Sequence, residues 1–328
     1  MLQHLTPVAG NEEFICGPGL QRTIDDARRA ALSSRTVLLM GETGTGKARI
    51  ARLIHEHSDR RDRPFIVWSA PEESETLGRR QLFGHVRGAF TGADQDSTGV
   101  LEAAHTGTLV FDDVDKTGSE LQGALLRFLD DSTVKRLGSN RETRVDVRLV
   151  ITANRPFEDL VQQNLFLPDL AYRLEGLKIH IPPLRERSKD LPMLIRHFVD
   201  RFSAVYDCPS THFTRSAIKL LTQQPWPGNI RQLSAIVENL IFHSFESGRV
   251  GVSEVKGALK GGFKHAPLAS PSRNGRLLIT RQELVDALDS VRWNSVIAAQ
   301  RLKIPLRTMR RKMQEFGLAR GKAVGVRL

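Results

Sequence analysis

The sequence is poor in cysteine, with only Cys16 and Cys208 among 328 residues, and it has no run of about 18 apolar residues. Two cysteines are too few for a disulfide framework and match no metal-ligand spacing, which fits a reducing compartment. The N-terminal residues lack a basic region followed by an apolar stretch, so a secretory signal is excluded together with a membrane span. We therefore expect a cytoplasmic protein with no membrane partner.

Acidic residues are also in deficit, because 37 Asp and Glu face 48 Lys and Arg and give a formal net charge of +11. Such an excess of positive charge favours polyanionic partners, nucleic acid or nucleotide, without choosing between them. The length of the chain and its hydrophobic content of 40% permit large cores and indicate two or three domains rather than one.

Short apolar segments alternate with helix-like segments over the first half of the chain. This alternation predicts an α/β domain, in which a parallel sheet lies between layers of helices. From Asp190 to Ser244 the apolar residues recur with helical periodicity instead, so we expect a separate all-helical subdomain, interrupted at Pro225 and at Pro227-Gly228. The expected strands are residues 36–40, 65–68, 108–111, 145–151 and 177–181.

A glycine-rich loop follows the first of these strands and precedes a helical stretch, ARIARLIHEH. Glycines let the backbone curl so that its N–H groups point at phosphate oxygens, Lys47 supplies a cation, and the following helix adds its N-terminal dipole. Because the strand and the helix are both present, the loop predicts nucleotide binding. The expected binding residues are Gly41, Glu42, Thr43, Gly44, Thr45, Gly46, Lys47 and Ala48.

The position after the lysine usually carries a hydroxyl that ligates Mg²⁺, but here it is Ala48. The metal then depends on the phosphates, on water and on another carboxylate. Asp112, at the end of the apolar segment TLVFDD, is the expected metal ligand, as in a Walker-B motif. A solvated strand end is the alternative interpretation of Asp112 and Asp113.

Between these two motifs lies the sequence GAFTGA, which comprises Gly88, Ala89, Phe90, Thr91, Gly92 and Ala93. It resembles the loop with which sigma-54-dependent transcription activators contact the sigma factor. A glycine-flanked turn with one aromatic residue would explain Phe90 but not the placement between Walker A and Walker B. Further segments resemble the same family in the same order, over about residues 12–245. They include Arg148, Asn154, the triplet Tyr172-Arg173-Leu174, the run from Pro182 to Arg187 and the run from Trp226 to Arg231.

The resemblance implies a ring-forming AAA+ ATPase that uses ATP and Mg²⁺ to remodel the sigma-54 RNA polymerase holoenzyme. It implies that Asn154 is the sensor I residue, that Arg173 is an arginine finger reaching a neighbouring subunit's nucleotide, and that Arg231 is the sensor II arginine of a helical lid. Such fingers contribute roughly 10³ to 10⁵ in rate by stabilising charge on the γ-phosphate. A surface ion pair is the alternative for either arginine.

Four residues depart from the family pattern at the expected catalytic site. Asp113 stands where the family has a Glu that polarises the attacking water, and Ser69 stands where an Asn restrains that Glu. Ala48 replaces the family's usual Glu, and Leu167 replaces a second arginine. These changes predict slow or partner-dependent hydrolysis, whereas the intact glycines and Lys47 predict unimpaired nucleotide binding.

The C-terminal residues predict three short helices. Thr280 and Glu283 form a capping-box pattern at the start of the first, Asn294 can cap a second through Leu302, and Pro305 suits the first turn of a third. The apolar residues of the third helix share one face, which leaves a basic face opposite. The pattern resembles a Fis-type helix-turn-helix that binds double-stranded DNA, with a helical hairpin bearing a solvated basic face as the alternative. The expected DNA-binding residues are Arg307, Thr308, Arg310 and Arg311.

The expected organisation is a tail over residues 1–11, an AAA+ α/β nucleotide-binding subdomain over 12–183, a helical lid over 184–250, a linker over 251–276, the helix-turn-helix over 277–320 and a basic tail over 321–328. The leading interpretation is an ATPase that binds an upstream enhancer, self-associates into a ring and activates transcription. The second is a DNA-binding subunit with weakened ATPase activity, acting in a mixed ring beside a competent paralogue. A general AAA+ remodeller is disfavoured by the GAFTGA loop. No receiver or ligand-sensing domain is expected ahead of the ATPase module, which leaves regulation to a separate protein, to expression level or to the DNA.

Overall fold

The computed structural model describes residues 16–70, 74–206, 211–244, 248–260 and 281–289, and single residues and short runs between 293 and 318. The chain forms two compact units. One comprises Met1–Phe198 and Ile218–Val237, and the other comprises Val199–Ala217 and Glu238–Leu328. No helix of the described residues is long and apolar enough to cross a membrane.

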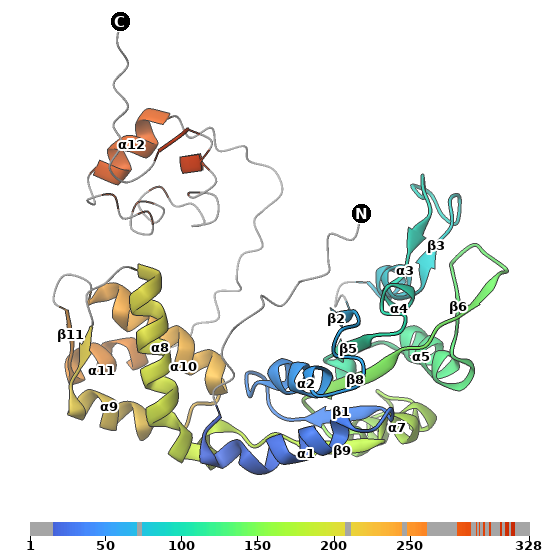
Figure 1. Cartoon of the computed structure of the whole chain (residues 1–328), viewed down its shortest axis with the longest axis horizontal. Coiled ribbons are helices and arrows are strands. Elements are labelled where there is room, and N and C mark those ends of the chain that lie inside the picture. Colours follow the sequence, from blue (N-terminus) through green and yellow to red (C-terminus); the bar gives the residue numbers. More distant parts are fainter. Residues whose placement is uncertain are drawn as a thin grey trace, which may run out of the picture. The chain divides into compact units, whose positions relative to one another are not determined.

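A five-stranded sheet, parallel throughout, forms the centre of the first unit (Figure 1). The strand order is β2-β5-β8-β1-β9. Because all five strands run parallel, their carboxyl ends lie at the same edge of the sheet. All five strands were predicted from the apolar segments, and the α/β prediction is confirmed. The strands are β1 Val37–Met40, β2 Phe65–Ser69, β5 Thr108–Asp112, β8 Arg148–Ala153 and β9 Leu177–His180.

Alternate residues of the strands build two separate cores, because successive side chains point to opposite faces of a sheet. Val37 and Leu39 pack with helices α1 and α2 on one face. Leu38 and Met40 pack on the other face with α4, α5, α6 and α7. The covering helices are α1 Gln21–Ala31, α2 Lys47–Glu56, α4 Val100–Ala103, α5 Ser119–Asp131, α6 Phe157–Gln162 and α7 Pro168–Leu174.

Arg148, one of the residues on which the family resemblance rests, is a buried cation at the start of β8. Its guanidinium donates to the carbonyl oxygens of Ala30 at 2.6 Å and Ala31 at 3.1 Å, at the C-terminal end of α1. The last carbonyls of a helix carry the negative end of its dipole and have lone pairs to spare, and the carbonyl of Ala30 accepts the backbone N–H of Ser33 at 3.1 Å as well. Burial lowers the pKa of Arg148, and the helix end provides the compensating hydrogen bonds.

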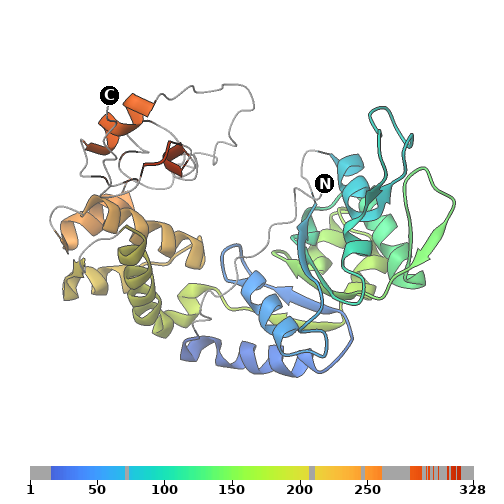
Figure 2. The ribbon, with the colours of Figure 1, turned by 45° about the horizontal axis from the view of Figure 1, so that its top comes forward.

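Two short hairpins extend from the sheet unit and lie side by side in both views (Figures 1 and 2). The first pairs β3 Gly84–His85 with β4 Ser97–Thr98 after helix α3 Glu75–Phe83, and the second pairs β6 Thr133–Lys135 with β7 Glu142–Arg144. A bridge between His85 and Leu137 joins the two hairpins. The GAFTGA sequence lies between β3 and β4, so it forms the tip of the first hairpin and is not part of the five-stranded sheet.

After the sheet the chain becomes helical, as predicted. Pro225 and the Pro227-Gly228 pair lie between α9 and α10, where the break was expected. The prediction of a linker from residue 251 is wrong at its start, because residues 252–260 form helix α11 with Val255 buried. The elements are η1 Pro18–Leu20, η2 Val114–Lys116, η3 Leu184–Asp190, α8 Leu191–Tyr206, β10 His212–Phe213, α9 Arg215–Thr222, α10 Asn229–His243, β11 Arg249–Val250 and α11 Val252–Lys260.

The C-terminal region is described from helix α12, Arg281–Asp289, onward. Leu284 and Leu288 are buried in a small apolar cluster that also contains Met309, and Met313 and Phe316 pack against it. The prediction that the apolar residues of the third helix share one face is confirmed for Met309, Met313 and Phe316. The predicted DNA-binding residues Arg307, Thr308, Arg310 and Arg311 lie outside the described residues.

Candidate functional site

The glycine-rich loop connects the end of β1 to the first residue of α2. Gly44 and Gly46 have φ values of +82° and +105°, a region that favours glycine. A Cβ on Gly44 would also lie 2.6 Å from the carbonyl oxygen of Gly228. The first amide groups of a helix have no acceptor within the helix, so the amides of Lys47 and Ala48 at the start of α2 suit an anion. The loop therefore fits phosphate groups.

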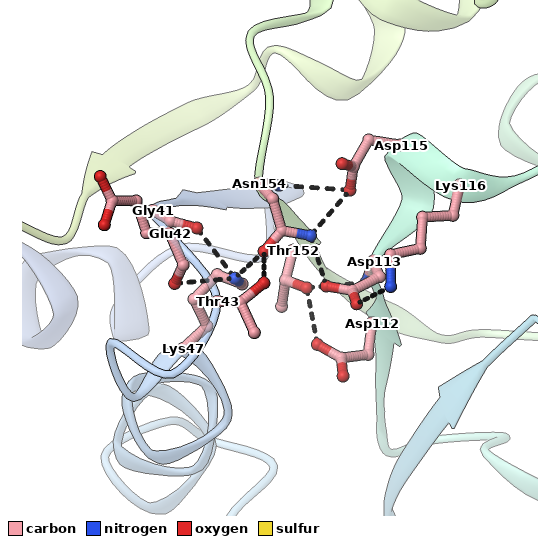
Figure 3. Close-up of polar contacts among 10 residues, drawn as sticks. All are labelled: Gly41, Glu42, Thr43, Lys47, Asp112, Asp113, Asp115, Lys116, Thr152 and Asn154. Carbon is pink, nitrogen blue, oxygen red and sulfur yellow. Dashed lines mark hydrogen bonds and ion pairs between the residues drawn. The ribbon is translucent and has the colours of Figure 1, made fainter. Parts of the chain in front are cut away.

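Lys47 is buried, with 7% of its surface exposed. Its ammonium donates to the carbonyl oxygen of Gly41 at 2.9 Å and to the Oδ1 of Asn154 at 2.6 Å (Figure 3). Burial lowers the pKa of Lys47, and the carboxylates of Asp113 and Asp112 oppose that shift without cancelling it. A buried cation whose nearest acceptors are neutral oxygens is poised to receive a phosphate.

Asn154 follows the last residue of β8 and touches both halves of the site. Its Oδ1 accepts from Lys47 and, at 3.1 Å, from the hydroxyl of Thr43, whereas its Nδ2 donates to the Oδ1 of Asp113 at 2.9 Å. Its backbone N–H donates to Asp115 at 3.2 Å. One amide side chain thus links the phosphate loop to the acidic end of β5, as Figure 3 shows.

Asp112 and Asp113 occupy the end of β5 and differ in their contacts. The hydroxyl of Thr152 donates to Asp112 at 2.6 Å and accepts the backbone N–H of Asp113 at 2.8 Å. Asp113 has a φ of +54° and an ion pair with Lys116 at 3.1 Å. Burial opposes ionisation of Asp113, but the hydrogen bonds from Asn154 and Lys116, together with the charges of Lys116 and Lys47, keep its pKa below the usual value. The second carboxylate is therefore fixed and ionised.

The start of helix α10 lies directly against the phosphate loop. The backbone N–H of Ile230 donates to the carbonyl oxygen of Gly44 at 3.0 Å. Arg231 is exposed in the first turn of α10, and its charge is close enough to contribute to the lowered pKa of Lys47. The structure thus brings Arg231 to the loop, where the sequence predicted a sensor.

Among the described residues, Arg173 forms no hydrogen bond or ion pair with this group of residues. It belongs to α7, its side chain is 58% exposed, and it forms an ion pair with Asp130 of α5. The Nε of Arg173 donates to Asp130 at 3.0 Å. Within one chain, the alternative of a surface ion pair therefore describes Arg173.

The GAFTGA loop closes on itself through its backbone. The N–H of Gly88 donates to the carbonyl of Ala93 at 2.9 Å, and the N–H of Ala93 donates to Phe90 at 3.0 Å. The guanidinium carbon of Arg80 lies 3.5 Å from the centre of the Phe90 ring, a cation–π contact. Thr91 is exposed beside this anchored ring, so the loop presents a polar side chain on a supported turn.

The remaining departures from the family pattern are Ser69, Leu167 and Ala48. Ser69 is exposed at the end of β2, opposite Asp112 in the sheet register, and no hydrogen bond joins its side chain to Asp113 among the described residues. Leu167 precedes α7, and its polar contacts are those of its backbone: its N–H donates to Gln122 at 2.9 Å and its carbonyl accepts from Ala171 at 3.0 Å. Ala48 is exposed in the first turn of α2. Asp113 therefore has Asn154 and Lys116 as its restraints.

Several residues of the site were not predicted. Thr152, Asp115 and Lys116 complete the network of Figure 3. Thr152 could have been found, because it lies two residues before Asn154 and strand neighbours at that spacing share a face. Asp115 and Lys116 belong to the short helix η2, whose place beside Asn154 no sequence period indicates.

The sheet order, the phosphate loop and the helical segment after the sheet define the class as an AAA+ P-loop ATPase fold. NtrX from Brucella abortus, solved in complex with ATP, matches with a TM-score of 0.68 and 23% identity, over 94% of this chain and 69% of that chain. Family models match as the Sigma-54 interaction domain over residues 15–180, the AAA+ ATPase lid domain over 185–270 and the Bacterial regulatory protein, Fis family, over 279–316. The chain belongs to the sigma-54-dependent transcription activators.

Characterised relatives agree with this assignment. The Nif-specific regulatory protein of Azotobacter vinelandii is 36% identical over 315 residues, which are 94% of this chain and 60% of the relative. The regulatory protein AtoC of Escherichia coli is 35% identical over 311 residues, which are 92% of this chain and 67% of AtoC. The chain thus spans about 60% of the length of the Azotobacter protein.

Proposed function

We propose that this chain hydrolyses ATP and uses the energy to remodel sigma-54 RNA polymerase through the GAFTGA loop while bound to enhancer DNA. The observation that carries the proposal is the convergence of Lys47, Asn154 and Asp113, with hydrogen bonds of 2.6 Å and 2.9 Å, beside a glycine loop and a helix N-terminus. That arrangement supplies a cation and amides for phosphates, and a fixed carboxylate for a water molecule.

The residues divide the chemistry among them. Lys47 and the amides at the start of α2 bind and orient the phosphates. Asp112, held by Thr152, has the oxygen ligands that Mg²⁺ prefers, and Mg²⁺ bound there would neutralise charge on the phosphates. Asp113 accepts a proton from the attacking water, and Asn154 holds Asp113 in place.

Arg173 acts on a neighbouring subunit in this proposal. Its pairing with Asp130 rather than with the phosphate loop and its 58% exposed side chain fit a group that completes a site in another copy. A ring supplies that geometry, because each subunit's finger then meets the next subunit's nucleotide. Leaving Asp130 costs little, since exposed ion pairs contribute about 0 to 1 kcal/mol.

Transcription activation requires two further surfaces. The loop from Gly88 to Ala93 is proposed to contact sigma-54, with Phe90 anchored on Arg80 and Thr91 exposed. The C-terminal helix-turn-helix is proposed to bind the enhancer through Arg307, Thr308, Arg310 and Arg311. Basic residues on a recognition helix read base edges or neutralise phosphates.

A second candidate function is a partner subunit with weak hydrolysis, which works beside a competent paralogue. The observation in its favour is the environment of Asp113, which is one methylene shorter than Glu, is paired with Lys116 at 3.1 Å and has Ser69 in place of a restraining Asn. Positioning errors at a general base can forfeit part of a contribution of about 10² to 10⁴ in rate.

The test of the leading proposal is Lys47→Ala in the purified full chain. We expect loss of binding to fluorescent ADP and loss of ATP hydrolysis, with DNA binding unchanged because it belongs to a separate domain. Lys189→Ala, an exposed lysine of η3, serves as the matched control. Nucleotide binding by Lys47→Ala equal to that of the control would refute the assigned site.

A further inference from the structure

The carboxylate of Glu42 points away from Lys47 and Asn154 (Figure 3). Both of its oxygens are engaged by Arg185 of η3, with Nη1 at 2.9 Å from Oε2 and Nη2 at 2.7 Å from Oε1. Paired N–H bonds of this kind fix the planes of both groups. The hydrogen bonds from Arg185 and Asn229 lower the pKa of Glu42, so the carboxylate is charged at neutral pH. An ionised carboxylate held in this way is unsuited to contact a phosphate.

Asn229 connects this ion pair to helix α10. It is fully buried, and it adopts a φ of +51°, a conformation that asparagine tolerates better than most residues. Its Nδ2 donates to Glu42 and to the carbonyl oxygen of Thr43, each at 3.1 Å, and its Oδ1 accepts the N–H of Leu184 at 2.7 Å. One side chain therefore joins the phosphate loop, the start of η3 and the first residue of α10.

Arg231 lies two residues after Asn229 on the same helix turn. Together with the bond from Ile230 to Gly44, the contacts of Asn229 fix the start of α10 against the loop. The bond from Asn229 to Glu42 is thus one of the contacts that set the position of Arg231 relative to Lys47, the two cations assigned to the phosphates. On the other side of the loop, Arg187 donates to the carbonyl of Thr45 at 2.7 Å, which holds the loop itself in place.

We propose that Glu42 is a positioning residue that joins the phosphate loop, through Arg185 and Asn229, to the helix carrying Arg231, and so sets the preference of the site for a third phosphate. The inference rests on the proposed function, because it assumes that the loop binds ATP. The ion pair is 40 to 45% exposed, so it contributes little to folding stability. Its effect is confined to the placement of Arg231.

The experiment compares the affinities of fluorescent ADP and fluorescent ATPγS for the full chain and its Glu42→Gln variant. We expect the ratio of the two affinities to shift against ATPγS by about 5- to 20-fold, a usual size for coupling between sites. The ADP affinity should change by less than about twofold, because Lys47 and the loop amides remain. Glu158→Gln is the control, since it removes the same charge from an exposed ion pair with Lys178 elsewhere on the surface.

If Glu42→Gln folds poorly, replacement of Arg185 tests the same ion pair from its other side. Arg185→Ala should shift the affinity ratio in the same direction, and the double variant should be no worse than Glu42→Gln, because both changes remove one interaction. Arg185→Lys retains charge without the paired bonds and should fall between Arg185→Ala and the original protein.

The outcomes separate this inference from the proposed function. An affinity ratio in Glu42→Gln equal to that of the original chain, whether both affinities fall or neither does, would overturn the positioning role. The nucleotide site would still stand in that case, provided that Lys47→Ala fails to bind ADP. Persistent ADP binding by Lys47→Ala would instead refute the nucleotide site itself, whatever Glu42→Gln does.

Discussion

Asn154 joins Lys47 to Asp113, accepting from the ammonium of Lys47 at 2.6 Å through Oδ1 and donating to the carboxylate of Asp113 at 2.9 Å through Nδ2. The cation assigned to phosphate binding and the carboxylate assigned to water activation therefore share one neutral side chain. Removal of Asn154 would therefore leave both groups without a shared partner.

Replacing Asn154 by Ala tests this link. We expect kcat for ATP hydrolysis to fall by about 10- to 100-fold, because a misplaced general base forfeits part of its contribution of about 10² to 10⁴ in rate. ADP affinity should change little, since Lys47 keeps the carbonyl of Gly41. Steady-state kinetics and fluorescent ADP titration measure the two effects. A loss of ADP affinity as large as the loss of kcat would show that Asn154 serves only to hold Lys47.

The lowered pKa of Lys47 predicts proton uptake on nucleotide binding. Burial holds the pKa of the free site below the ordinary 10.5, and bound phosphates would raise it. Nucleotide binds to the form in which Lys47 is protonated. The nucleotide affinity is therefore full below the pKa of Lys47 in the free protein, and it falls as the pH rises from that pKa toward the pKa of Lys47 in the complex. Calorimetry in buffers of different ionisation enthalpy should detect uptake at alkaline pH and none at neutral pH. Lys47→Arg, which stays charged, should take up no proton, and equal uptake by both proteins would exclude Lys47.

Asp113→Glu tests whether the shorter carboxylate limits hydrolysis. If the chain is a weakened subunit, the added methylene restores the reach that the family uses, and turnover by the purified protein should rise by about tenfold or more. Asp115→Glu, which lengthens a neighbouring carboxylate bonded to Asn154, controls for a general effect of size. Robust hydrolysis by the unmodified chain that Asp113→Glu does not increase would eliminate the mixed-ring alternative.

The basic face predicted near the C-terminus has its own test. Arg310→Ala and Arg311→Ala should each weaken binding to an enhancer fragment, by about 1 to 3 kcal/mol where the side chain contacts a base edge. A residue that contacts only phosphate should instead reduce the salt dependence of binding. Salt titrations of both variants decide between these roles, and unchanged binding in both would place DNA recognition elsewhere.

The fold was largely predictable because its sheet is buried on both faces. Strand β1 is apolar at all four positions, and such runs stand out against the helical segments between them. Helix α11 was missed because Val255 is its only buried residue and Gly257 lies within it, so the helix leaves no apolar period. The β3–β4 and β6–β7 hairpins were not foreseen, since strands of two or three residues are too short to show alternation.

The site was predictable only in part. Lys47, Asp112 and Asp113 sit at motifs whose neighbours in sequence identify them. Their contacts depend on Thr152 and Asp115, which reach the site only through the sheet order and the turn after β5. The contacts of the Glu42 side chain could not be predicted, because its partners Arg185 and Asn229 lie more than 140 residues away. Such contacts follow from the tertiary fold.

Formation of an open promoter complex tests the central claim most directly. Purified chain, sigma-54 RNA polymerase holoenzyme and a supercoiled template with an enhancer are combined with ATP, with ADP or with ATPγS, and permanganate reactivity reports the melted promoter. We predict melting with ATP alone, and loss of melting in Thr91→Ala with hydrolysis retained, because Thr91 lies on the exposed tip of the loop and away from Lys47. Melting that is independent of nucleotide, or melting by Thr91→Ala equal to that of the original chain, would contradict the account.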